Sequence, residues 1–588
     1  MNLTRRDFSK LMPGAAFALP MLGAGATTSL AAGPTSLRLE SFNLSGVRLL
    51  DGPLKQQFDQ CREIFLSIPD DAILFGFRQR AGLPSPGKSL DGWYGKDYFN
   101  AFGQYLAGMI RMAKAAGDGP LQAKAVFLMR EWAKAIDPDG FSFYTRKPNV
   151  MHYPYEKTMG GLNDLYEYAG EKDALVYADR ITDWAIKNLD RTRENPPGGG
   201  GQEWYTLSEN LYRAYLNTGD PKYREFAGVW HYDKYWNAFA DGHPDAVGLH
   251  AYSHVNTLSS AAMAFRVTGD PKYLRAIVNA YDYFQQTQCY ATGGYGPAEN
   301  LLPADGSLGE SLESSFDTFE TPCGSWAGFK LSRYLMGFTG EARYGDWVER
   351  LTYNCIGAAL PMTGAGNTFY YADYRICGGA KVYYESTWPC CSGTYPQAVA
   401  DYHNLIYFKD RDGLYVNLFV PSEVTWSRDD GAIVLRQETS YPESGRVVLT
   451  IASDRPVEMP LSFRVPAFAT SGMPVRINGA PERVEAQPGR WATIKRQWSR
   501  GDAIELQIPL ELAFVPIDKQ HPKRVAATRG PVVLVRQGQP PVPDFSKWTP
   551  IGNDRAAFEV TSTTASRYVP FYQVPKDQPY QMYFDLDV

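Results

Sequence analysis

The chain has 588 residues, of which 44% are apolar, and a formal net charge of −5. Its length exceeds that of one ordinary domain and predicts roughly two to four, and its charge argues against nucleic acid or an anionic membrane as a partner. Aromatic residues make up 14% of the chain. Such a content is typical of sugar-binding clefts, where rings stack on the apolar faces of sugars, and equally of a large core.

The first 32 residues predict a twin-arginine signal peptide. The twin arginines, Arg5 and Arg6, stand before a mainly apolar stretch over 11–30 and a small-residue cleavage site at Ala31. Prolines and glycines interrupt this stretch, which argues against a membrane anchor, and no other run reaches the about 18 apolar residues of a transmembrane helix. We therefore exclude 1–32 from the fold and expect a periplasmic or secreted protein, exported folded and with any metal already inserted.

A glycine-centred pattern recurs about every 50 residues through the first part of the chain. Each glycine follows one apolar helical pattern and precedes another, which makes the unit a helical hairpin. About six such hairpins predict an (α/α)6 barrel over residues 33–407. An open superhelix of the tetratricopeptide kind is the competing interpretation, but its period is about 34 residues. The central glycines are Gly117, Gly170, Gly219, Gly269 and Gly340.

The last of these intervals is about 20 residues longer than the others. The excess lies in 293–320, a stretch that is rich in Gly, Ser, Asp and Glu and has little helical pattern. A long insertion in a repeat array maps to a loop on one face, often the binding face. The acidic candidates in this loop are Glu299, Glu310, Glu313, Asp317 and Glu320.

After about residue 405 the chain changes to short alternating runs separated by Gly, Pro and Asp. Such runs predict antiparallel strands. We expect a β-sandwich over 408–510, and over 511–588 either a second small β-domain or an extension of the sandwich. The predicted fold class is therefore multidomain α plus all-β, with an (α/α)6 barrel followed by C-terminal β-sandwich domains.

Three of the seven cysteines lie in the motifs ETPCGSWAG and WPCCSG. Their odd number and irregular spacing argue against a disulfide framework. Glu320, Cys323, Cys390 and Cys391 could together close a tetrahedral Zn²⁺ site, because thiolates are soft ligands. Zinc can hold a thiolate deprotonated at neutral pH, as a nucleophile requires. With a carboxylic acid nearby, this is the chemistry of a retaining glycosidase with sulfur in place of one carboxylate.

At these motifs the chain resembles the β-L-arabinofuranosidases of glycoside hydrolase family 127 and their relatives in family 146. The resemblance spans nearly the whole chain after the signal peptide and includes GWYGKDYFNAFGQYLAG, TFYYADY and ATRGPVVLV. It implies an (α/α)6 barrel followed by β-sandwich domains. It also implies a zinc ion held by Glu320, Cys323, Cys390 and Cys391, with Cys390 as the nucleophile.

The resemblance implies further site residues. The acid/base glutamate of the family lies in a Gly-Glu step upstream of the zinc glutamate, and Glu310 occupies that place, with Glu313 as the alternative. A pocket histidine followed by Ala matches His250, although a histidine in a helical stretch is also typical of a core or capping residue. A tyrosine near the reacting cysteine matches Tyr371.

The chain departs from the family in two respects. Pro322 is inserted into the family's Glu-Thr-Cys sequence, which changes the spacing of Glu320 and Cys323. In addition, two sugar-binding histidines of the family are missing. Arabinofuranose is therefore expected as the substrate only by default, from the resemblance. The residues that we expect at or near the places of these histidines as substrate contacts are Lys157, Gln202, Glu203, Trp204 and His254.

Three functions fit these residues. The leading prediction is a zinc-dependent retaining exo-glycosidase, similar to β-L-arabinofuranosidases, that acts on plant or microbial glycans. The alternatives are a polysaccharide lyase, since such barrels also host β-elimination on uronides, and a non-catalytic carbohydrate-binding protein with a structural zinc. The intact thiols and the acidic loop favour the enzyme. The remaining cysteines, expected to be buried hydrophobes, are Cys61, Cys289, Cys355 and Cys377.

Overall fold

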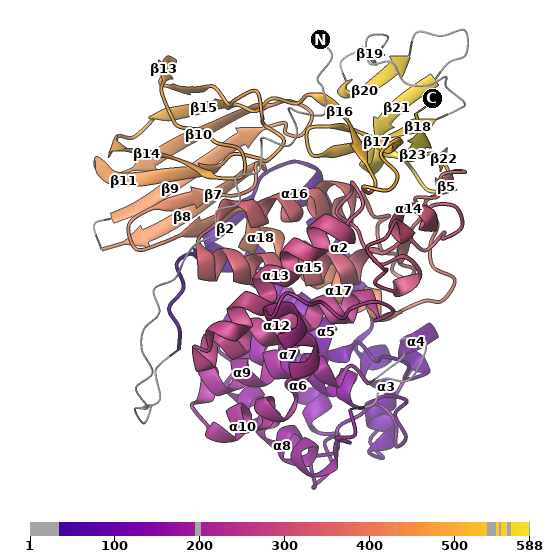
Figure 1. Cartoon of the computed structure of the whole chain (residues 1–588). Helices are drawn as coiled ribbons and strands as arrows, with labels where there is room; N and C mark the ends of the chain where they lie inside the picture. The colour runs from indigo at the N-terminus through magenta and orange to yellow at the C-terminus, as the bar shows by residue number, and fades with distance from the viewer. Residues whose placement is uncertain are drawn as a thin grey trace.

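The computed structural model describes residues 34–193, 202–429, 431–537, 548–551, 554–560 and 566–586. The signal peptide predicted at 1–32 lies outside these residues. Helices dominate the first part of the chain and strands the second, as predicted (Figure 1). Within the described ranges, no helix has both the length and the apolar character of a membrane-crossing segment.

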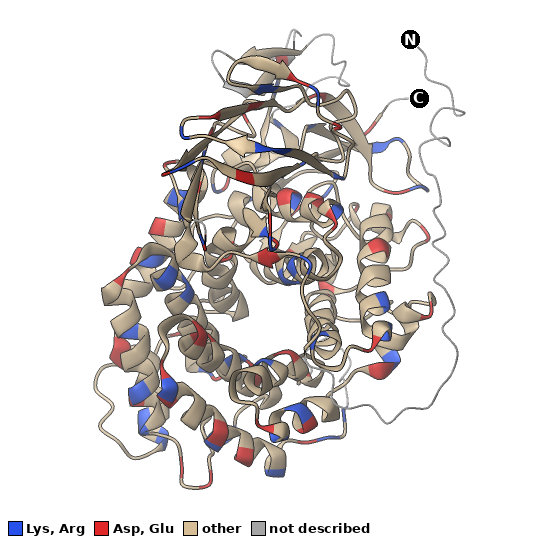
Figure 2. Cartoon of the chain, turned by 90° about the vertical axis from the view of Figure 1, so that its left-hand side faces the viewer, with Lys and Arg blue, Asp and Glu red and all other residues tan. Residues whose placement is uncertain are grey.

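Six helices form the inner ring of an (α/α)6 barrel. Each contacts the next along the chain and the last contacts the first, so the ring closes, as Figure 2 shows. Each inner helix also contacts one outer helix. This closure confirms the barrel and excludes the open superhelix. The inner helices are α5 (Phe102–Ala116), α7 (His152–Ala169), α9 (Leu207–Thr218), α12 (Ala251–Thr268), α15 (Thr321–Thr339) and α17 (Cys390–Ala400). Their outer partners are α6 (Gly119–Ala133), α8 (Lys172–Asn188), α10 (Pro221–Val229), α13 (Pro271–Thr287), α16 (Gly345–Asn354) and α2 (Pro53–Ser67).

The repeat glycines end the inner helices as predicted. All five adopt the left-handed conformation, with φ from 66° to 75°, which costs a residue without Cβ nothing. Asp220 and Asp270 then begin the outer helices α10 and α13, because each side chain accepts a hydrogen bond from a free N–H of the first turn. A proline follows each aspartate, where its missing N–H breaks no helical hydrogen bond.

The barrel interior is tightly packed. A Cβ on Gly103 of α5 would lie 2.2 Å from the backbone carbonyl of Lys157 on α7, so only glycine allows this approach. Much of the aromatic content fills the core, since Trp132, Trp236 and Trp347 are almost fully buried. The aromatic excess of the sequence is therefore partly a core property, as the competing interpretation held.

The inner helices are parallel, and all begin at one end of the barrel. Residues at or just before the first turn of all six line a single pocket at that end. Aligned peptide dipoles give helix N-termini a partial positive charge, which favours thiolates and carboxylates there. These residues, in the order of the helices, are Phe99, Tyr153, Glu203, His250, Glu320 and Cys390.

The long loop between α13 and α15 lies at this same end. It contains η3 (Pro297–Glu299), α14 (Ser307–Ser311) and β3 (Phe319–Glu320). Strand β3 pairs antiparallel with β4 (Tyr371–Ala372), and this pairing sets Glu320 opposite Tyr371. Two segments that the sequence identified separately are thus joined beside the pocket.

The first β-domain consists of two packed sheets, and residues 40–49 belong to it. The sequence assigned 40–49 to the barrel, but strands β1 and β2 join one sheet each. Leu39 and Phe42 on either side of β1 are buried, as are Val47 and Leu49 within β2. One sheet has the order β1 (Glu40–Ser41), β6 (Tyr407–Lys409), β7 (Leu414–Val416), β11 (Val457–Arg464) and β14 (Trp491–Trp498). The other has the order β13 (Ala480–Glu482), β12 (Val475–Ile477), β15 (Ala503–Gln507), β10 (Arg446–Ser453), β9 (Gly431–Thr439), β8 (Ser422–Arg428) and β2 (Val47–Leu49).

The strands after residue 511 form a separate sheet with a hydrophobic cluster of its own, which includes Val525, Leu534 and Phe584. A separate cluster favours a second small β-domain over an extension of the sandwich. Strand β5 (Gly379–Ala380) of the barrel region pairs with β22 (Pro579–Tyr580) and ties this domain to the barrel. The sheet contains β16 (Leu512–Pro516), β17 (Arg524–Arg529), β18 (Val532–Gln537), β21 (Ser566–Pro570), β20 (Asp554–Val560) and β19 (Trp548–Ile551), with β23 (Tyr583–Asp585) on β17.

Candidate active site

The four predicted metal ligands meet where α15 and α17 begin. Cys323 Sγ lies 3.3 Å from Cys391 Sγ and 3.7 Å from Cys390 Sγ. Glu320 Oε1 lies 3.5 Å and 3.6 Å from the sulfurs of Cys390 and Cys391. One ligand atom from each residue lies within 4.8 Å of all the others, and all four residues are buried. The structure therefore brings together the whole set.

The inserted Pro322 leaves this arrangement intact. It lies in the first turn of α15, where the absence of an N–H costs the helix nothing. Glu320 is the residue before the helix and Cys323 is in its first turn. The insertion is thus absorbed at the helix start, and both side chains still reach the cluster.

The cluster has the donor set of a soft metal ion. Three sulfurs and one carboxylate oxygen match a four-coordinate site of the zinc type. Glu320 Oε2 is buried and has no hydrogen-bond partner among the described residues. A buried carboxylate oxygen without a partner is costly, and a cation beside it would remove that cost. The residues therefore fit a bound metal.

Cys390 differs from the other two thiols. It lines the pocket and is 7% exposed, whereas Cys323 and Cys391 are fully buried. Burial raises the pKa of Cys323 and Cys391 well above the ordinary thiol value. Burial acts on Cys390 in the same sense, but hydrogen bonds from Cys323, Cys391 and the Tyr370 hydroxyl bring its pKa well below the ordinary value. Because Cys390 also begins α17, the helix dipole favours its thiolate.

The pocket above Cys390 has a volume of about 100 Å³. Sites for drug-sized molecules range from about 300 to 1,000 Å³, so this pocket suits a small group such as one sugar ring. The lining combines aromatic rings with convergent ionisable groups, a composition suited to a sugar. The lining residues are Trp93, Tyr98, Phe99, Tyr153, Glu203, His250, Tyr252, Glu299, Glu320, Tyr370 and Cys390.

Glu299 is held in this pocket by two hydrogen bonds. His250 Nε2 lies 3.1 Å from Glu299 Oε2, and the Tyr371 hydroxyl donates to Oε1. Burial raises the pKa of Glu299, but the His250 hydrogen bond outweighs it and the net pKa is lowered. Burial conversely lowers the pKa of His250, and Glu299 outweighs it, so the net pKa is raised. The pair therefore holds one proton over a wide pH range.

His250 has both of the roles that the sequence left open. It is the residue at the start of α12, where its Nδ1 lies 2.9 Å from the Ser253 hydroxyl of the first turn, while its Nε2 faces Glu299 in the pocket. The contact with Ser253 fixes the ring, and the fixed ring in turn orients the carboxylate.

The backbone is strained at three residues of the pocket. Phe99, Glu203 and Glu299 have φ values of 52°, 50° and 59°, in the left-handed region that side chains with a Cβ rarely adopt. Such conformations persist only where the surroundings enforce them, and they cluster at functional sites.

Comparison with known proteins identifies the family. Residues 46–404 match the model of the β-L-arabinofuranosidase GH127 catalytic domain, and residues 413–510 match that of the GH127 middle domain. The first match alone covers more than half of the chain. The chain belongs to glycoside hydrolase family 127. Membership makes it a glycoside hydrolase, as predicted, and supports neither the lyase nor the non-catalytic binding protein.

Solved structures show the same fold. A GH127 β-arabinofuranosidase superposes with a TM-score of 0.75 at 19% identity, over 94% of this chain and 98% of that one. A GH127 β-L-arabinofuranosidase from Geobacillus stearothermophilus T6 gives 0.72 at 19% identity, over 92% and 100%. A third structure, described as a glycoside hydrolase, gives 0.70 at 16% identity, over 94% and 98%. No curated protein matches the chain.

In this GH127 protein, Glu310 lies outside the pocket, which corrects its predicted placement. It is exposed on α14, which faces the second β-domain: the Gly309 N–H donates to Asp518, and Arg524 donates to the Gly309 carbonyl. The alternative, Glu313, pairs with Arg524 at 2.6 Å on the same surface. Glu299 occupies the pocket instead. The sequence placed it among the acidic residues of the loop, but no motif distinguished it.

Two predicted substrate contacts, His254 and Trp204, are packed behind the pocket wall. The His254 ring lies 4.5 Å from the Tyr205 ring, and burial lowers the pKa of His254 to about 3, so it is neutral. Trp204 is buried against Tyr205 and Tyr232. Neither lines the pocket. Gln202 is likewise turned elsewhere and bonds the Met151 N–H.

Lys157, another predicted contact, lines a second cavity farther along the barrel interior. Its Nζ lies 2.6 Å from Glu156 Oε2 and 4.7 Å from the centre of the Tyr153 ring. Tyr153 lines the pocket. Lys157 is thus the cation beneath the pocket wall rather than a group on its surface.

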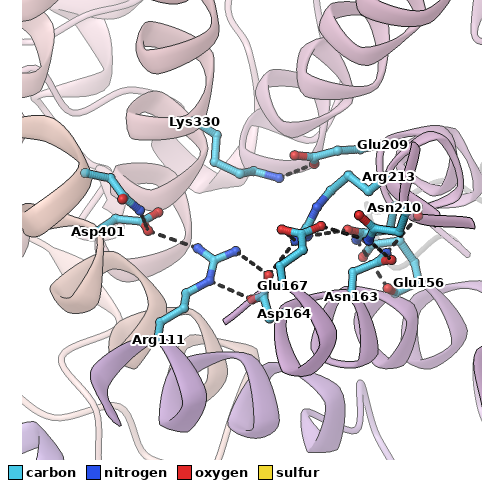
Figure 3. A network of polar contacts seen from close by, with 12 residues as sticks. Arg111, Glu156, Asn163, Asp164, Glu167, Glu209, Asn210, Arg213, Lys330 and Asp401 are labelled. Carbon is cyan, nitrogen blue, oxygen red and sulfur yellow. Dashed lines mark hydrogen bonds and ion pairs between the residues drawn. The ribbon is translucent and has the colours of Figure 1, made fainter. Parts of the chain in front are cut away.

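The second cavity is surrounded by paired charges (Figure 3). Arg111 bonds Asp164 at 2.6 Å and Asp401 at 3.0 Å, and Arg213 bonds Asp164 at 2.6 Å. Lys330 pairs with Glu209, which also accepts from Tyr334. These residues come mainly from the later turns of the inner helices, away from the end where the thiols lie.

Several pocket residues were not predicted from the sequence, although they lie in motifs that it contains. Trp93, Tyr98 and Phe99 belong to GWYGKDYFN, and Tyr370 belongs to TFYYADY. Their aromatic density was the available signal. Among the cysteines expected to be buried, Cys61 and Cys355 are, but Cys289 is only half-buried and Cys377 is exposed.

Proposed function

We propose that the protein is an exported, retaining exo-β-L-arabinofuranosidase that removes terminal sugars from plant or microbial glycans. One observation carries the proposal: the Cys390 thiol and the Glu299 carboxyl group open into the same sugar-sized pocket. A nucleophile and an oriented acid/base beside one cavity are what a double displacement at a glycosidic carbon requires.

The metal ligands are Glu320, Cys323, Cys390 and Cys391, and we propose Zn²⁺ as the ion that they hold. Bound there, zinc would keep the Cys390 sulfur in its thiolate form at neutral pH and make it a better leaving group.

In the first step the Cys390 sulfur attacks the anomeric carbon. The new carbon–sulfur bond forms as the bond from that carbon to the glycosidic oxygen breaks. Glu299 donates its proton to this oxygen as it leaves. In the resting pair the proton lies mainly on His250, which passes it to Glu299 along the 3.1 Å contact between Nε2 and Oε2 as the leaving oxygen is protonated, so Glu299 is a carboxylate when the first step ends. The lowered pKa of Glu299 is therefore compatible with an acid role.

In the second step Glu299 acts as the base. A water molecule gives its proton to the carboxylate, and its oxygen bonds to the anomeric carbon as the carbon–sulfur bond breaks. The sulfur returns to the thiolate form. Two inversions at one carbon leave its configuration retained.

The test is hydrolysis of a nitrophenyl β-L-arabinofuranoside by the wild type and by Cys390→Ala and Cys390→Ser. We expect both variants to lose at least about 10³-fold in kcat, because the covalent route is closed. Cys377→Ala is the matched control, since that thiol is exposed, and it should keep wild-type activity. Hydrolysis that survives in both Cys390 variants, or a first product of inverted configuration by NMR, would contradict the proposal.

A further inference from the structure

Glu203 is the pocket residue that the proposed chemistry leaves without a role. It stands just before η2 (Trp204–Thr206), at the start of α9, and its side chain lines the pocket together with Cys390 and Glu299. It is not one of the four clustered metal ligands. Its residue is 4% exposed, so the carboxyl group is removed from bulk water.

The Glu203 carboxyl group has no hydrogen-bond partner in the described part of the chain, and its Oε2 is fully buried. Two basic side chains are candidates to pair with it, but Lys157 is bonded to Glu156 and His250 is bonded to Glu299. Buried carboxylates elsewhere in the barrel are satisfied, as Glu209 is by Lys330 and Tyr334. Because Glu203 also lines the pocket, its unpartnered carboxyl group indicates a ligand that brings the donors.

The backbone holds this carboxyl group in place at a cost. Glu203 has φ 50° and ψ 33°, a left-handed conformation that costs a residue with a Cβ on the order of 1 kcal/mol. The Glu203 carbonyl accepts from both the N–H and the hydroxyl of Thr206 at 3.0 and 2.9 Å, which locks the turn. Glycine would relieve the strain but would remove the carboxyl group.

We propose that Glu203 is a specificity-determining residue that accepts hydrogen bonds from ring hydroxyl groups of the terminal sugar. The ligand class is a glycoside whose terminal ring carries free hydroxyl groups on the side facing α9. Sugar hydroxyls are the donors that a polar, aromatic-lined pocket would receive, and two carboxyl oxygens can accept from a neighbouring pair. The inference rests on the proposed function and adds the group that reads the sugar.

The competing role is acid/base catalysis. Burial raises the pKa of Glu203 to about 7, a value suitable for a general acid. The two roles differ in one observable. An acid acts on the leaving group, so its loss harms glycosides of poor leaving groups far more than activated ones. A residue that binds the terminal ring is indifferent to the leaving group and sensitive to the ring hydroxyls.

The experiment compares Glu203→Gln and Glu203→Asp with the wild type. The substrates are a nitrophenyl β-L-arabinofuranoside, the corresponding methyl glycoside, and the 2-deoxy and 3-deoxy forms of the nitrophenyl glycoside. We expect Glu203→Gln to lose about 10- to 100-fold in kcat/KM, by the same factor for both leaving groups. We also expect the wild type to reject at least one deoxy substrate by about 100-fold or more, and the variant to reject it much less, because the unpaired carboxylate is gone.

Glu203→Asp tests position, since it keeps the charge and withdraws it from the pocket, and it should lose as much as Glu203→Gln. Glu313→Gln, on the outer surface, is the control. Zinc content and thermal unfolding show whether each variant is folded. Binding of the nitrophenyl glycoside to Cys390→Ala, with and without Glu203→Gln, supplies a readout without turnover and should weaken about 10-fold or more in the double variant.

The outcomes distinguish an error in the proposed sugar from an error in the role of Glu203. If the wild type hydrolyses no β-L-arabinofuranoside but hydrolyses another nitrophenyl glycoside, the proposed sugar is wrong, and the same variants are tested on that glycoside and its deoxy forms. If the wild type is active and Glu203→Gln matches it in kcat/KM and in deoxy discrimination, the inference about Glu203 is overturned. A loss confined to the methyl glycoside would also overturn it, in favour of acid catalysis.

Discussion

The barrel interior contains two polar regions that are equally buried and differ in how their charges are compensated. In the network of Figure 3, Asp164 touches two guanidinium groups and Glu209 touches an ammonium group. In the pocket, no described residue forms a hydrogen bond with the Glu203 carboxyl group or with Glu320 Oε2. The helices are the same in both places, but the network draws mainly on their later turns, apart from Glu209 in the first turn of α9, and the pocket draws on their starts.

The pKa values show the consequence. Burial raises the pKa of Asp164, but Arg111 and Arg213 outweigh it, and the net pKa lies below its ordinary value. Burial raises the pKa of Glu203 to about 7, because Lys157 and His250 offset it only in part, and burial raises that of Glu320 well above its ordinary value. Paired charges thus hold helices together, whereas charges without partners are available to a metal or a substrate. The comparison yields four predictions.

Metal removal should have the largest effect on activity, because it changes the pocket and leaves the paired charges of the network in place. Chelation under reducing conditions would leave three thiols and Glu320 without their ion, so we expect hydrolysis of arabinofuranosides to be lost completely and the thermal midpoint to fall. Zn²⁺ should restore both, and Mg²⁺ neither, because thiolates select soft ions. Metal content by mass spectrometry and the rate would be followed together. Full activity in metal-free protein would contradict the assignment.

Asp164→Asn should break the network and spare the pocket. It leaves Arg111 and Arg213 buried with one fewer carboxylate, which costs about 3–5 kcal/mol of unfolding free energy. Denaturant unfolding measures that loss, while kcat/KM per folded molecule should stay at the wild-type value. Glu313→Gln removes an exposed ion pair with Arg524 and should cost at most about 1 kcal/mol. Equal losses of unfolding free energy in the two variants would mean that the buried network stabilises the fold no more than a surface ion pair does.

Features that rest on local signals could be predicted from the sequence, whereas features that rest on distant partners could not. Helix ends marked by glycine, and strands marked by alternation, are local signals, and they predicted the barrel and the sandwich. The ligand cluster was also predictable, because three thiols and a glutamate stand in two short motifs that the fold brings to neighbouring helix starts. Strands β1 and β2 escaped prediction, because their partners lie more than 350 residues away.

The acid/base residue could not be selected in this way. Glu299 and Glu310 lie in one acidic loop, and both precede Glu320. What separates them is tertiary: the left-handed turn at Glu299 directs it to His250, whereas α14 carries Glu310 to the surface. For the same reason Lys157, which pairs with Glu156 on α7, faces the second cavity rather than the sugar pocket. A side chain's direction from a helix start depends on neighbours that no local pattern encodes.

Glu299→Gln should slow the enzyme without unfolding it. The amide keeps the contacts with His250 and Tyr371 but neither gives nor takes the proton, so we expect kcat to fall by about 10² or more. The loss should be larger for methyl than for nitrophenyl glycosides, which leave without protonation. Glu310→Gln is the matched control from the same loop and should be neutral. An equal loss of kcat in Glu299→Gln and Glu310→Gln would contradict the assignment of the acid/base role to Glu299 and would favour an acidic residue on the surface of the loop.

The smallest expected effect is a shift in pH dependence in His250→Gln. In the wild type the pair keeps the proton that the leaving oxygen needs below the raised pKa of His250. Removing the imidazole removes this proton store and leaves Glu299 as the source of the proton, so the alkaline limb of the kcat/KM profile should move to lower pH. The active range narrows on its alkaline side. A profile of kcat/KM against pH measures this, with circular dichroism to show that α12 survives the substitution. If the range keeps its width, the contact between His250 and Glu299 only orients the carboxylate, and the proton comes directly from solvent.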